Sequence, residues 1–313
     1  MPVLSGCSAQ LDQPYQMSAF EPDSVYGNEQ GIRADGFAKE LCLPDQEVSA
    51  VNTEGVTADS FALFDVTDKT VISQNQVFEK VYPASTTKIL TCLIALERGN
   101  LDDIVTVPED AAITVSGSSM ADLKPGDQLS LRDLLYGLMV PSGNDAAVTI
   151  AKHIGGSVSA FVALMNERAV ELGATQSHFA NPHGLPDEAH YTTVYDMYLI
   201  FNAALKEPQF AQFASTKEYT AEVTGADGTK RQVTWKNGNA YLAGKYDMPE
   251  GYSIVGGKTG HTNAAGFCLV LGEKDEAGKQ YISIVFKAPS YEALYGSMTE
   301  LIKKGGTGAQ TSE

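Results

Sequence analysis

The sequence contains no apolar run that reaches the roughly 18 residues of a membrane-spanning helix, and it has no cluster of lysine or arginine. The first absence argues against a membrane span. Positive charge is scarce as well, because 22 lysine and arginine residues stand against 39 aspartate and glutamate residues and leave a net charge of −17. An acidic chain without a basic patch argues against nucleic acid as a partner and against electrostatic binding to a membrane surface.

Patterns that bind metals or support histidine-dependent catalysis are also missing. The spacing of the four cysteines fits no zinc site, and the sequence leaves their pairing open. Cys92 and Cys268 lie inside apolar segments and are expected to be buried thiols. The His-Glu-x-x-His motif of metallopeptidases and the Gly-x-Ser-x-Gly motif of histidine-dependent hydrolases do not occur. We therefore expect no metal and no other cofactor.

What the chain does have is enough apolar sequence for a substantial core: 43% of its 313 residues are hydrophobic. Residues 1–52 differ from the rest, because much of this stretch is rich in Gln, Asp, Ser, Pro and Gly, and we predict a polar tether there. Residues 53–304 are predicted to form one domain, with a helical subdomain at roughly 105–215. Residues 305–313 are predicted to be a flexible tail.

The tether begins with a tetrapeptide, residues 4–7, that resembles the lipobox of bacterial lipoproteins, in which the cysteine is acylated after signal cleavage. No charged and apolar signal region precedes it. We therefore expect that the signal sequence was removed from this chain or that its first residue was assigned too far downstream. Cys7 is therefore the expected lipid attachment site, and a lipid there is the only membrane contact that we predict.

Hydrophobic periodicity predicts sheet at both ends of the domain and mostly helix between them. The expected strands are residues 60–66, 70–73, 253–260, 266–271 and 281–286, and the expected helices are residues 85–98, 127–140, 145–153, 158–172 and 291–302. Short turns join the later strands, so they should be antiparallel neighbours. The last helix has one apolar stripe and is expected to pack on that sheet.

A nucleophile and a base are expected where the first helix begins. Ser85 would lie in the first helical turn, where free N–H groups and the helix dipole favour a developing negative charge. Lys88 follows three residues later on the same face and can reach the serine oxygen. Ser-x-x-Lys alone is a weak signal, because serine and lysine are ordinary helix residues, but it occurs only once in the chain.

Two further motifs make the pattern specific. Ser142-Gly143-Asn144 starts 57 residues after Ser85, in a predicted turn, and a Lys-Thr-Gly motif, residues 258–260, starts 116 residues after Ser142. Ser-x-Asn alone is weak, and residues 73–75 match it as a decoy. Lys258 supplies a cation near the predicted site, and Gly260 is expected to leave room for the backbone of a ligand.

With these motifs in order, the sequence resembles the penicillin-binding serine D-alanyl-D-alanine carboxypeptidases of low molecular mass, from about residue 58 to residue 304. The resemblance extends to residues 145–147, 181–185, 190–193 and 261–262. It implies an α/β (α+β) fold like that of serine DD-peptidases and β-lactamases, with an antiparallel sheet flanked by helices beside an all-helical subdomain. It also implies a cell-envelope enzyme outside the cytoplasm.

The resemblance implies a role for each motif residue. Ser85 would attack the carbonyl between the last two D-alanines of a peptidoglycan stem peptide, and neutral Lys88 would take its proton. Ser142 would relay a proton to the leaving amine, while Asn144 would hold Lys88 or a substrate amide. The implied substrate-binding residues are Lys258, Thr259, Gly260 and His261, with the backbone N–H groups of Ser85 and His261 as the oxyanion hole. Water would release the acyl-enzyme, and β-lactams would acylate Ser85 and inhibit.

Departures from the family and rival functions stay open. Some members carry a basic residue inside the Asn-x-Asn segment that here reads Asn237-Gly238-Asn239, so a carboxylate contact from that place would come from Lys236 or be absent. A serine β-lactamase is the nearest rival, but the Glu-x-x-Leu-Asn pentad of class A enzymes is missing. A non-catalytic β-lactam or peptidoglycan sensor is the second rival. Asn181, His183 and His190 are expected to support the fold rather than react.

Overall fold

The structure is a computed structural model that describes residues 38–45, 49–113 and 115–306. The chain divides into two units, Met1–Lys39 and Glu40–Glu313. Everything below concerns the second unit, taken by itself. Most of the predicted tether, with Cys7, and residues 307–313 of the predicted tail lie outside the described residues.

A six-stranded sheet, in the order β1-β3-β2-β10-β9-β8, forms the centre of the unit. Its strands are β1 (Ala50–Val51), β2 (Ser60–Asp65), β3 (Thr70–Asn75), β8 (Tyr252–Thr262), β9 (Gly266–Asp275) and β10 (Gln280–Ala288). All neighbours are antiparallel, as predicted. The strands β2 and β10 come from opposite ends of the sequence and pair with Ala62 opposite Ile284. This order leaves β8 at one edge of the sheet.

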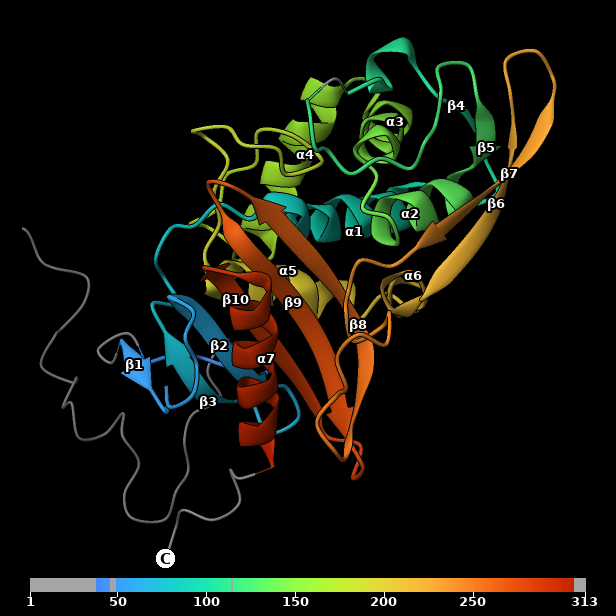
Figure 1. Ribbon diagram of the computed structural model, residues 1–313. Helices are drawn as coiled ribbons and strands as arrows, with labels where there is room; N and C mark the ends of the chain where they lie inside the picture. Colours follow the sequence, from blue (N-terminus) through green and yellow to red (C-terminus); the bar gives the residue numbers. More distant parts are fainter. Residues whose placement is uncertain (1–37, 46–48, 114, 307–313) are drawn as a thin grey trace, which may run out of the picture. The chain divides into compact units, whose positions relative to one another are not determined.

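Both faces of the sheet are covered, which explains why the residues of β2 are all buried. Helix α7 (Tyr291–Gly305) packs on one face through the predicted stripe, and Leu294, Met298 and Leu301 share an apolar cluster with Leu269 of β9. Ser290 caps this helix by accepting a hydrogen bond from the N–H of Ala293. The opposite face of the sheet packs against α5, so the two helices lie on different sides of it (Figure 1).

The helical part surrounds one helix that is almost entirely buried. Its helices are α1 (Lys88–Arg98), α2 (Leu131–Met139), α3 (Asn144–Gly155), α4 (Val158–Glu171), α5 (Val194–Ala204) and α6 (Phe210–Ser215), with 3₁₀ turns at η3 (Ala84–Thr87) and η4 (Glu109–Ala111). The first eight residues of α1 are buried, because α2, α3, α4, α5 and α6 all pack against it. α1 therefore starts at the sheet and passes into the helical part (Figure 1).

The helical part also carries a four-stranded sheet that the sequence analysis did not predict. It consists of β4 (Ile104–Thr106), β5 (Gln128–Ser130), β6 (Glu218–Thr224) and β7 (Lys230–Lys236), in that order. The helix predicted over residues 127–140 was wrong at its start, since residues 128–130 pair with β4. Ser130 then caps α2 by accepting from the N–H of Asp133, which places the helix start at Leu131.

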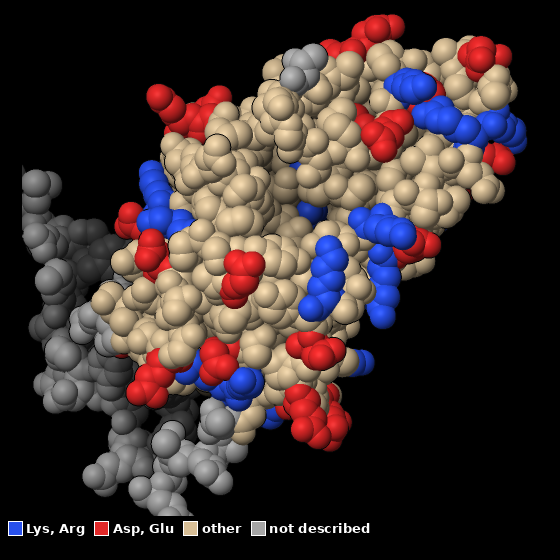
Figure 2. All heavy atoms as spheres, viewed as in Figure 1, with Lys and Arg blue, Asp and Glu red and all other residues tan. Residues whose placement is uncertain are grey.

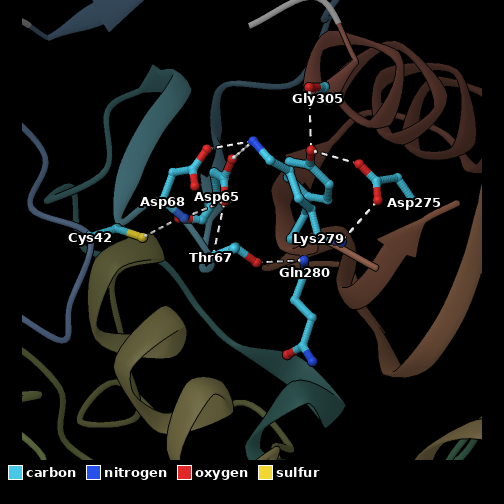
Figure 3. Close-up of polar contacts among 9 residues, drawn as sticks. Cys42, Asp65, Thr67, Asp68, Asp275, Lys279, Gln280 and Gly305 are labelled. Atoms are coloured by element: carbon cyan, nitrogen blue, oxygen red, sulfur yellow. Dashed lines mark hydrogen bonds and ion pairs between the residues drawn. The ribbon is translucent and has the colours of Figure 1, made fainter. Parts of the chain in front are cut away.

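At one end of the main sheet, beside α5, two turns are tied together (Figure 3). Asp65 accepts hydrogen bonds from the backbone N–H groups of Thr67 (3.0 Å) and Asp68 (2.8 Å). Lys279 pairs with both Asp65 and Asp68, and the N–H of Gln280 donates to Thr67 Oγ1 (2.9 Å). These contacts hold the β2–β3 turn against the β9–β10 turn.

The three cysteines of the described part, Cys42, Cys92 and Cys268, are free thiols and fully buried, as predicted for the last two. Among the described residues no single helix combines the length and the apolar composition of a membrane crossing. The pair α3 and α4 meets these criteria only when the two are taken together, across a bend of 84°.

Candidate active site

The chain turns sharply at Ser85. Ala84 has a φ of +47°, which is rare for a residue with a side chain, and the next residues form the 3₁₀ turn η3. The hydroxyls of Thr86 and Thr87 donate to the carbonyls of Pro83 (2.7 Å) and Ala84 (2.8 Å) and hold this turn. Ser85 thus lies one 3₁₀ turn before α1, in the first helical turn as predicted.

Lys88 is fully buried, and its Nζ has three oxygen neighbours. These are Ser85 Oγ at 2.9 Å, Asn144 Oδ1 at 2.7 Å and the carbonyl oxygen of His183 at 2.7 Å. The amide and carbonyl oxygens can only accept, whereas a serine hydroxyl can also donate. An ammonium would donate to all three oxygens, and a neutral amine satisfies the same contacts by donating to Asn144 and His183 and accepting the proton of Ser85.

The electrostatic surroundings favour that neutral amine. Burial, and then the neighbouring Lys258, lower the pKa of Lys88 well below its ordinary value, while Asp145 opposes the shift. Two nearby histidines are neutral at pH 7, because burial lowers the pKa of His183 to about 3 and that of His190 to about 4. Lys88, which contacts Ser85 directly, can thus act as its base near neutral pH.

The predicted second motif forms a strained turn between α2 and α3. Ser142 has a φ of +65°, in a region that L-residues seldom adopt. Backbone bonds hold the turn on both sides: the N–H of Gly143 donates to the carbonyl of Gly137 (2.9 Å), and that of Asn144 donates to Ser119 (2.9 Å). The turn presents Ser142 Oγ to Lys258 and Asn144 Oδ1 to Lys88.

Lys258 reaches the site from the edge strand β8. Its Nζ donates to Ser142 Oγ (2.8 Å) and to the carbonyl of Thr259 (3.0 Å), and the residue is 2% exposed. An ammonium has three N–H donors, so one remains for a further acceptor. Burial lowers the pKa of Lys258 to about 7. Two contacts therefore join the three predicted motifs: that of Lys88 with Asn144 and that of Lys258 with Ser142.

Gly260 lines the cavity described below and also lets two parts of the chain approach each other closely. A Cβ at this position would lie 3.0 Å from the nitrogen of Ser85 and 3.1 Å from the carbonyl oxygen of Pro83. The space left by the missing side chain is occupied by the chain's own η3 turn. Gly260 therefore brings β8 against the backbone of Ser85, which places His261 and Ser85 on adjacent segments.

A cavity of about 200 Å³ opens beside these residues. Ser85, Ser142, Thr259 and His261 line it together with one aromatic and apolar wall, made by Phe267, Tyr291, Leu294 and Tyr295. Figure 2 shows a hollow on this face with the colour of a basic side chain at its floor. Sequence reasoning assigned Tyr291, Leu294 and Tyr295 only to packing on the sheet, because nothing in their spacing separates a cavity wall from a core stripe.

The segment before α5 supports the nucleophile turn from the other side. Ala180 N–H donates to His190 Nδ1 (3.0 Å), so His190 Nε2 carries the hydrogen and donates to Thr87 Oγ1 (2.8 Å). Gly184 has a φ of +91°, and a Cβ there would lie 1.8 Å from the carbonyl oxygen of Ala84. The sequence analysis expected support from this segment but missed the contact of the His183 carbonyl with Lys88.

The described residues contain no group of three or more His, Cys, Asp or Glu side chains arranged for a metal ion. The chemistry that this arrangement supports uses its own side chains: a serine hydroxyl paired with a buried amine, a second hydroxyl paired with a buried lysine, and backbone N–H groups beside the nucleophile. These are the elements of acyl transfer through a covalent serine intermediate.

Comparison with known proteins agrees with this chemistry. Residues 47–290 match the family model described as D-alanyl-D-alanine carboxypeptidase. The chain is 33% identical to the carboxypeptidase DacF of Bacillus subtilis over 72% of its own length, and 33% identical to DacD of Salmonella typhimurium over 88%. It spans 56% of the length of the first relative and 70% of that of the second.

Solved structures give the same picture. A Streptomyces DD-transpeptidase superimposes with a TM-score of 0.76 at 31% identity, covering 82% of this chain and all of that one. The D-alanyl-D-alanine carboxypeptidase DacD from Francisella tularensis gives a TM-score of 0.72 at 28% identity, covering 86% of this chain and 75% of that one. The predicted fold class is confirmed.

Proposed function

The chain belongs to the D-alanyl-D-alanine carboxypeptidase family, and from this premise we propose that it is a serine-type D-Ala-D-Ala carboxypeptidase. Its substrate would be a peptidoglycan stem peptide that ends in D-Ala-D-Ala, and its inhibitors would be β-lactams. One observation carries the proposal: the buried Lys88 Nζ lies 2.9 Å from Ser85 Oγ, with its two other neighbours able only to accept.

The acylation step follows from that contact. Ser85 Oγ attacks the carbonyl carbon of the penultimate D-alanine while its proton passes to the lone pair of Lys88. The backbone N–H groups of Ser85 and His261 are the proposed donors to the oxyanion. Ser142, held by Lys258, passes its proton to the leaving nitrogen and receives in turn the proton that Lys88 took from Ser85, so that Lys88 is neutral again. The C–N bond then breaks, D-alanine departs, and the peptide remains as an ester on Ser85.

Recognition of the terminal carboxylate falls to β8. The free N–H of Lys258 and the hydroxyl of Thr259 are the proposed partners, since Thr259 lines the cavity, Lys258 contacts the cavity residue Ser142, and a charge-assisted hydrogen bond is short and strong. Asn144 orients Lys88 through the 2.7 Å contact. In the second half of the cycle water attacks the ester carbonyl, Lys88 accepts a proton from that water and returns it to Ser85 Oγ as the ester bond breaks, and the shortened peptide leaves.

The test combines a peptide and an inhibitor. We expect the wild type to release D-alanine from diacetyl-Lys-D-Ala-D-Ala and to gain the mass of benzylpenicillin on Ser85 in intact-mass spectrometry. Ser85→Ala should lose both, because the nucleophile is gone. Ser159→Ala, at an exposed serine of α4, is the control and should retain both.

The rival functions give other results. Rapid repeated turnover of nitrocefin without an adduct would favour a serine β-lactamase. A stable penicillin adduct without release of D-alanine would favour a sensor. The sequence lacks the Glu-x-x-Leu-Asn pentad with which class A β-lactamases drive deacylation, so we expect the penicillin adduct to persist.

Placement in the cell is part of the proposal. The substrate lies in the cell envelope, so the enzyme would act outside the cytoplasm, held by a lipid on Cys7. This rests on the lipobox-like tetrapeptide of residues 4–7 alone. Expression of the gene with its natural upstream sequence in the presence of a tagged fatty acid should label the wild type and not Cys7→Ser. Equal labelling of the wild type and Cys7→Ser, or no labelling of either protein, would contradict the proposed lipid anchor.

A further inference from the structure

We propose that Asp145 is a positioning residue for this reaction: its carboxylate compensates the charge of one of the two buried lysines and holds the Ser142 turn in its strained conformation. The proposal rests on the proposed function, because it concerns the same lysine and the same acylation step. Asp145 follows Asn144 directly at the start of α3 and is fully buried.

The hydrogen bonds of Asp145 favour its ionised form. Its carboxylate oxygens accept from three backbone N–H groups, those of Ala121 (2.8 Å), Leu123 (3.0 Å) and Ala146 (2.9 Å). Burial raises the pKa of this group, and the three N–H groups oppose the rise. The site thus contains a fixed negative charge.

Counting the charges around Lys88 then sets its state. The titratable groups that face it are Lys258 from β8, Asp145 from α3, and His183 and His190 from the segment before α5. Both histidines are neutral, so one carboxylate is left to balance two buried amines. Two buried ammonium groups would leave one uncompensated, which is costly away from water. One carboxylate therefore balances one ammonium group. Asp145 also opposes the fall in the pKa of Lys88, so that this neutral amine remains basic enough to accept a proton.

Asp145 also acts on the geometry through residues 119–123. Its two bonds to Ala121 and Leu123 hold this segment against the Ser142 turn, where the carbonyl of Ser119 accepts from the N–H of Asn144. From the other side, Trp235 Nε1 donates to the carbonyl of Ala121 (2.9 Å). A Cβ on Gly143 would lie 2.7 Å from the Cβ of Ala121.

These contacts explain how a residue with a positive φ persists at Ser142. Such a conformation costs about 1–3 kcal/mol and survives only where the surroundings determine it. Gly143 is held to Gly137, Asn144 to Ser119, and the segment of Ser119 is held by Asp145 and Trp235 together. Asp145 contributes both charge and geometry, and Trp235 contributes geometry alone. This difference provides the matched control.

The experiment measures the rate of Ser85 acylation by benzylpenicillin from about pH 5 to about pH 9. Loss of the negative charge in Asp145→Asn lowers the pKa of Lys88, so the acid limb of the profile should move to lower pH by about one unit. Trp235→Phe removes the Nε1 bond and leaves the charge, so its rate should fall while its acid limb stays in place. Asp145→Glu should keep the wild-type limb.

An acid limb of Asp145→Asn that coincides with the wild type, or that moves to higher pH, would overturn the proposal while leaving the proposed function intact. A wild type that is not acylated would instead refute the proposed function. Should Asp145→Asn fail to fold, ¹³Cε NMR of the wild-type lysines decides: at about pH 6 we expect one buried ammonium and one buried amine. Two ammonium groups would overturn the charge balance.

Discussion

Two residues beside the site, Ala84 and Ser142, have positive φ angles although neither is glycine. Ala84 directly precedes the nucleophile Ser85, and Ser142 carries the second hydroxyl of the proposed mechanism. Close backbone contacts with other segments hold both residues in place. For Ala84 the contact is Gly184, whose missing side chain lets its backbone approach the carbonyl next to Ser85. Strain of this kind is concentrated at functional sites because the surroundings must over-determine it.

The role of Gly184 can be tested by adding one methyl group. In Gly184→Ala the new Cβ would lie 1.8 Å from the carbonyl oxygen of Ala84, so the Ser85 turn must move. We expect the penicillin acylation rate to fall at least about tenfold and the free energy of unfolding to drop by about 2 kcal/mol or more. Stopped-flow acylation and urea unfolding measure the two effects.

Gly156→Ala is the matched control. Gly156 ends α3 with a φ of +74°, close to that of Gly184, but a Cβ there meets no atom within 4 Å. It should therefore lose about 1 kcal/mol of stability from backbone strain and keep its acylation rate. Equal acylation rates in the two variants would show that the approach of Gly184 to Ala84 is irrelevant to the nucleophile.

Sequence reasoning found the residues that carry rare chemistry and missed those that shape the site. Ser85, Lys88 and Ser142 belong to motifs whose order is improbable by chance, so their meeting could be predicted. Tyr291 could not be placed at the cavity, since an aromatic residue on a helix stripe looks the same in a core. The contact of the His183 carbonyl was equally hidden, because every residue has a carbonyl.

At the scale of elements, helix α7 packs on the face of the main sheet that carries the buried glutamate Glu273. Glu273 lies on the same face of β9 as Leu269 and Leu271, which pack beneath α7, and it is fully buried. One carboxyl oxygen meets the hydroxyl of Ser283, and the other has no hydrogen-bond partner among the described residues. Burial raises the pKa of Glu273 from its ordinary 4.5 to about 8. The group is therefore neutral at pH 7.

This predicts that stability falls as the pH rises from about 4.5 to about 8. The folded state binds this proton more tightly than the unfolded chain, so the free energy of unfolding decreases by about 1.4 kcal/mol per pH unit between the two pKa values and then levels off. Glu273→Gln cannot ionise and should lose this slope, which makes it more stable than the wild type at about pH 9. Urea unfolding at several pH values measures the slope.

The exposed Glu276 in the β9–β10 turn gives the control. Glu276→Gln changes the net charge by the same amount and should retain the wild-type slope. If both variants show the wild-type dependence on pH, the buried position of Glu273 has no effect on stability.

The elements were predictable where they are long and periodic. The main-sheet strands and α7 were found because runs of apolar residues are bounded by turn residues. The β6–β7 hairpin was missed, although Tyr219, Ala221 and Val223 alternate with polar residues in a way that indicates a half-buried strand. β4 and β5 have three residues each, which is too few to show an alternation of apolar and polar residues.

At the scale of the whole molecule, the site exists because three distant segments meet. The η3 turn comes from the start of α1, the Ser142 turn from the helical part, and Lys258 from the edge strand of the main sheet. The net charge of −17 gave no hint of a site built on two buried lysines, since surface composition does not report on a buried pocket.

The division of the chain into tether, domain and tail stays a prediction. Cys42, fully buried and bonded through its thiol to the carbonyl of Asp65, lies on the N-terminal side of the boundary predicted after residue 52, as does β1. Limited proteolysis followed by mass spectrometry would locate the boundary, because exposed tethers are cleaved before packed segments.

The central claim is that a neutral Lys88 takes the proton of Ser85, and the acylation rate of Lys88→Met tests it most directly. Methionine fills a similar volume without an amine, and Lys206→Met, in the connection between α5 and α6, controls for the change in composition. General-base catalysis contributes about 10²–10⁴-fold. We predict that benzylpenicillin acylates Lys88→Met at least about a hundredfold more slowly than the wild type, while Lys206→Met is unaffected. A folded Lys88→Met that acylates within about threefold of the wild-type rate would contradict the account.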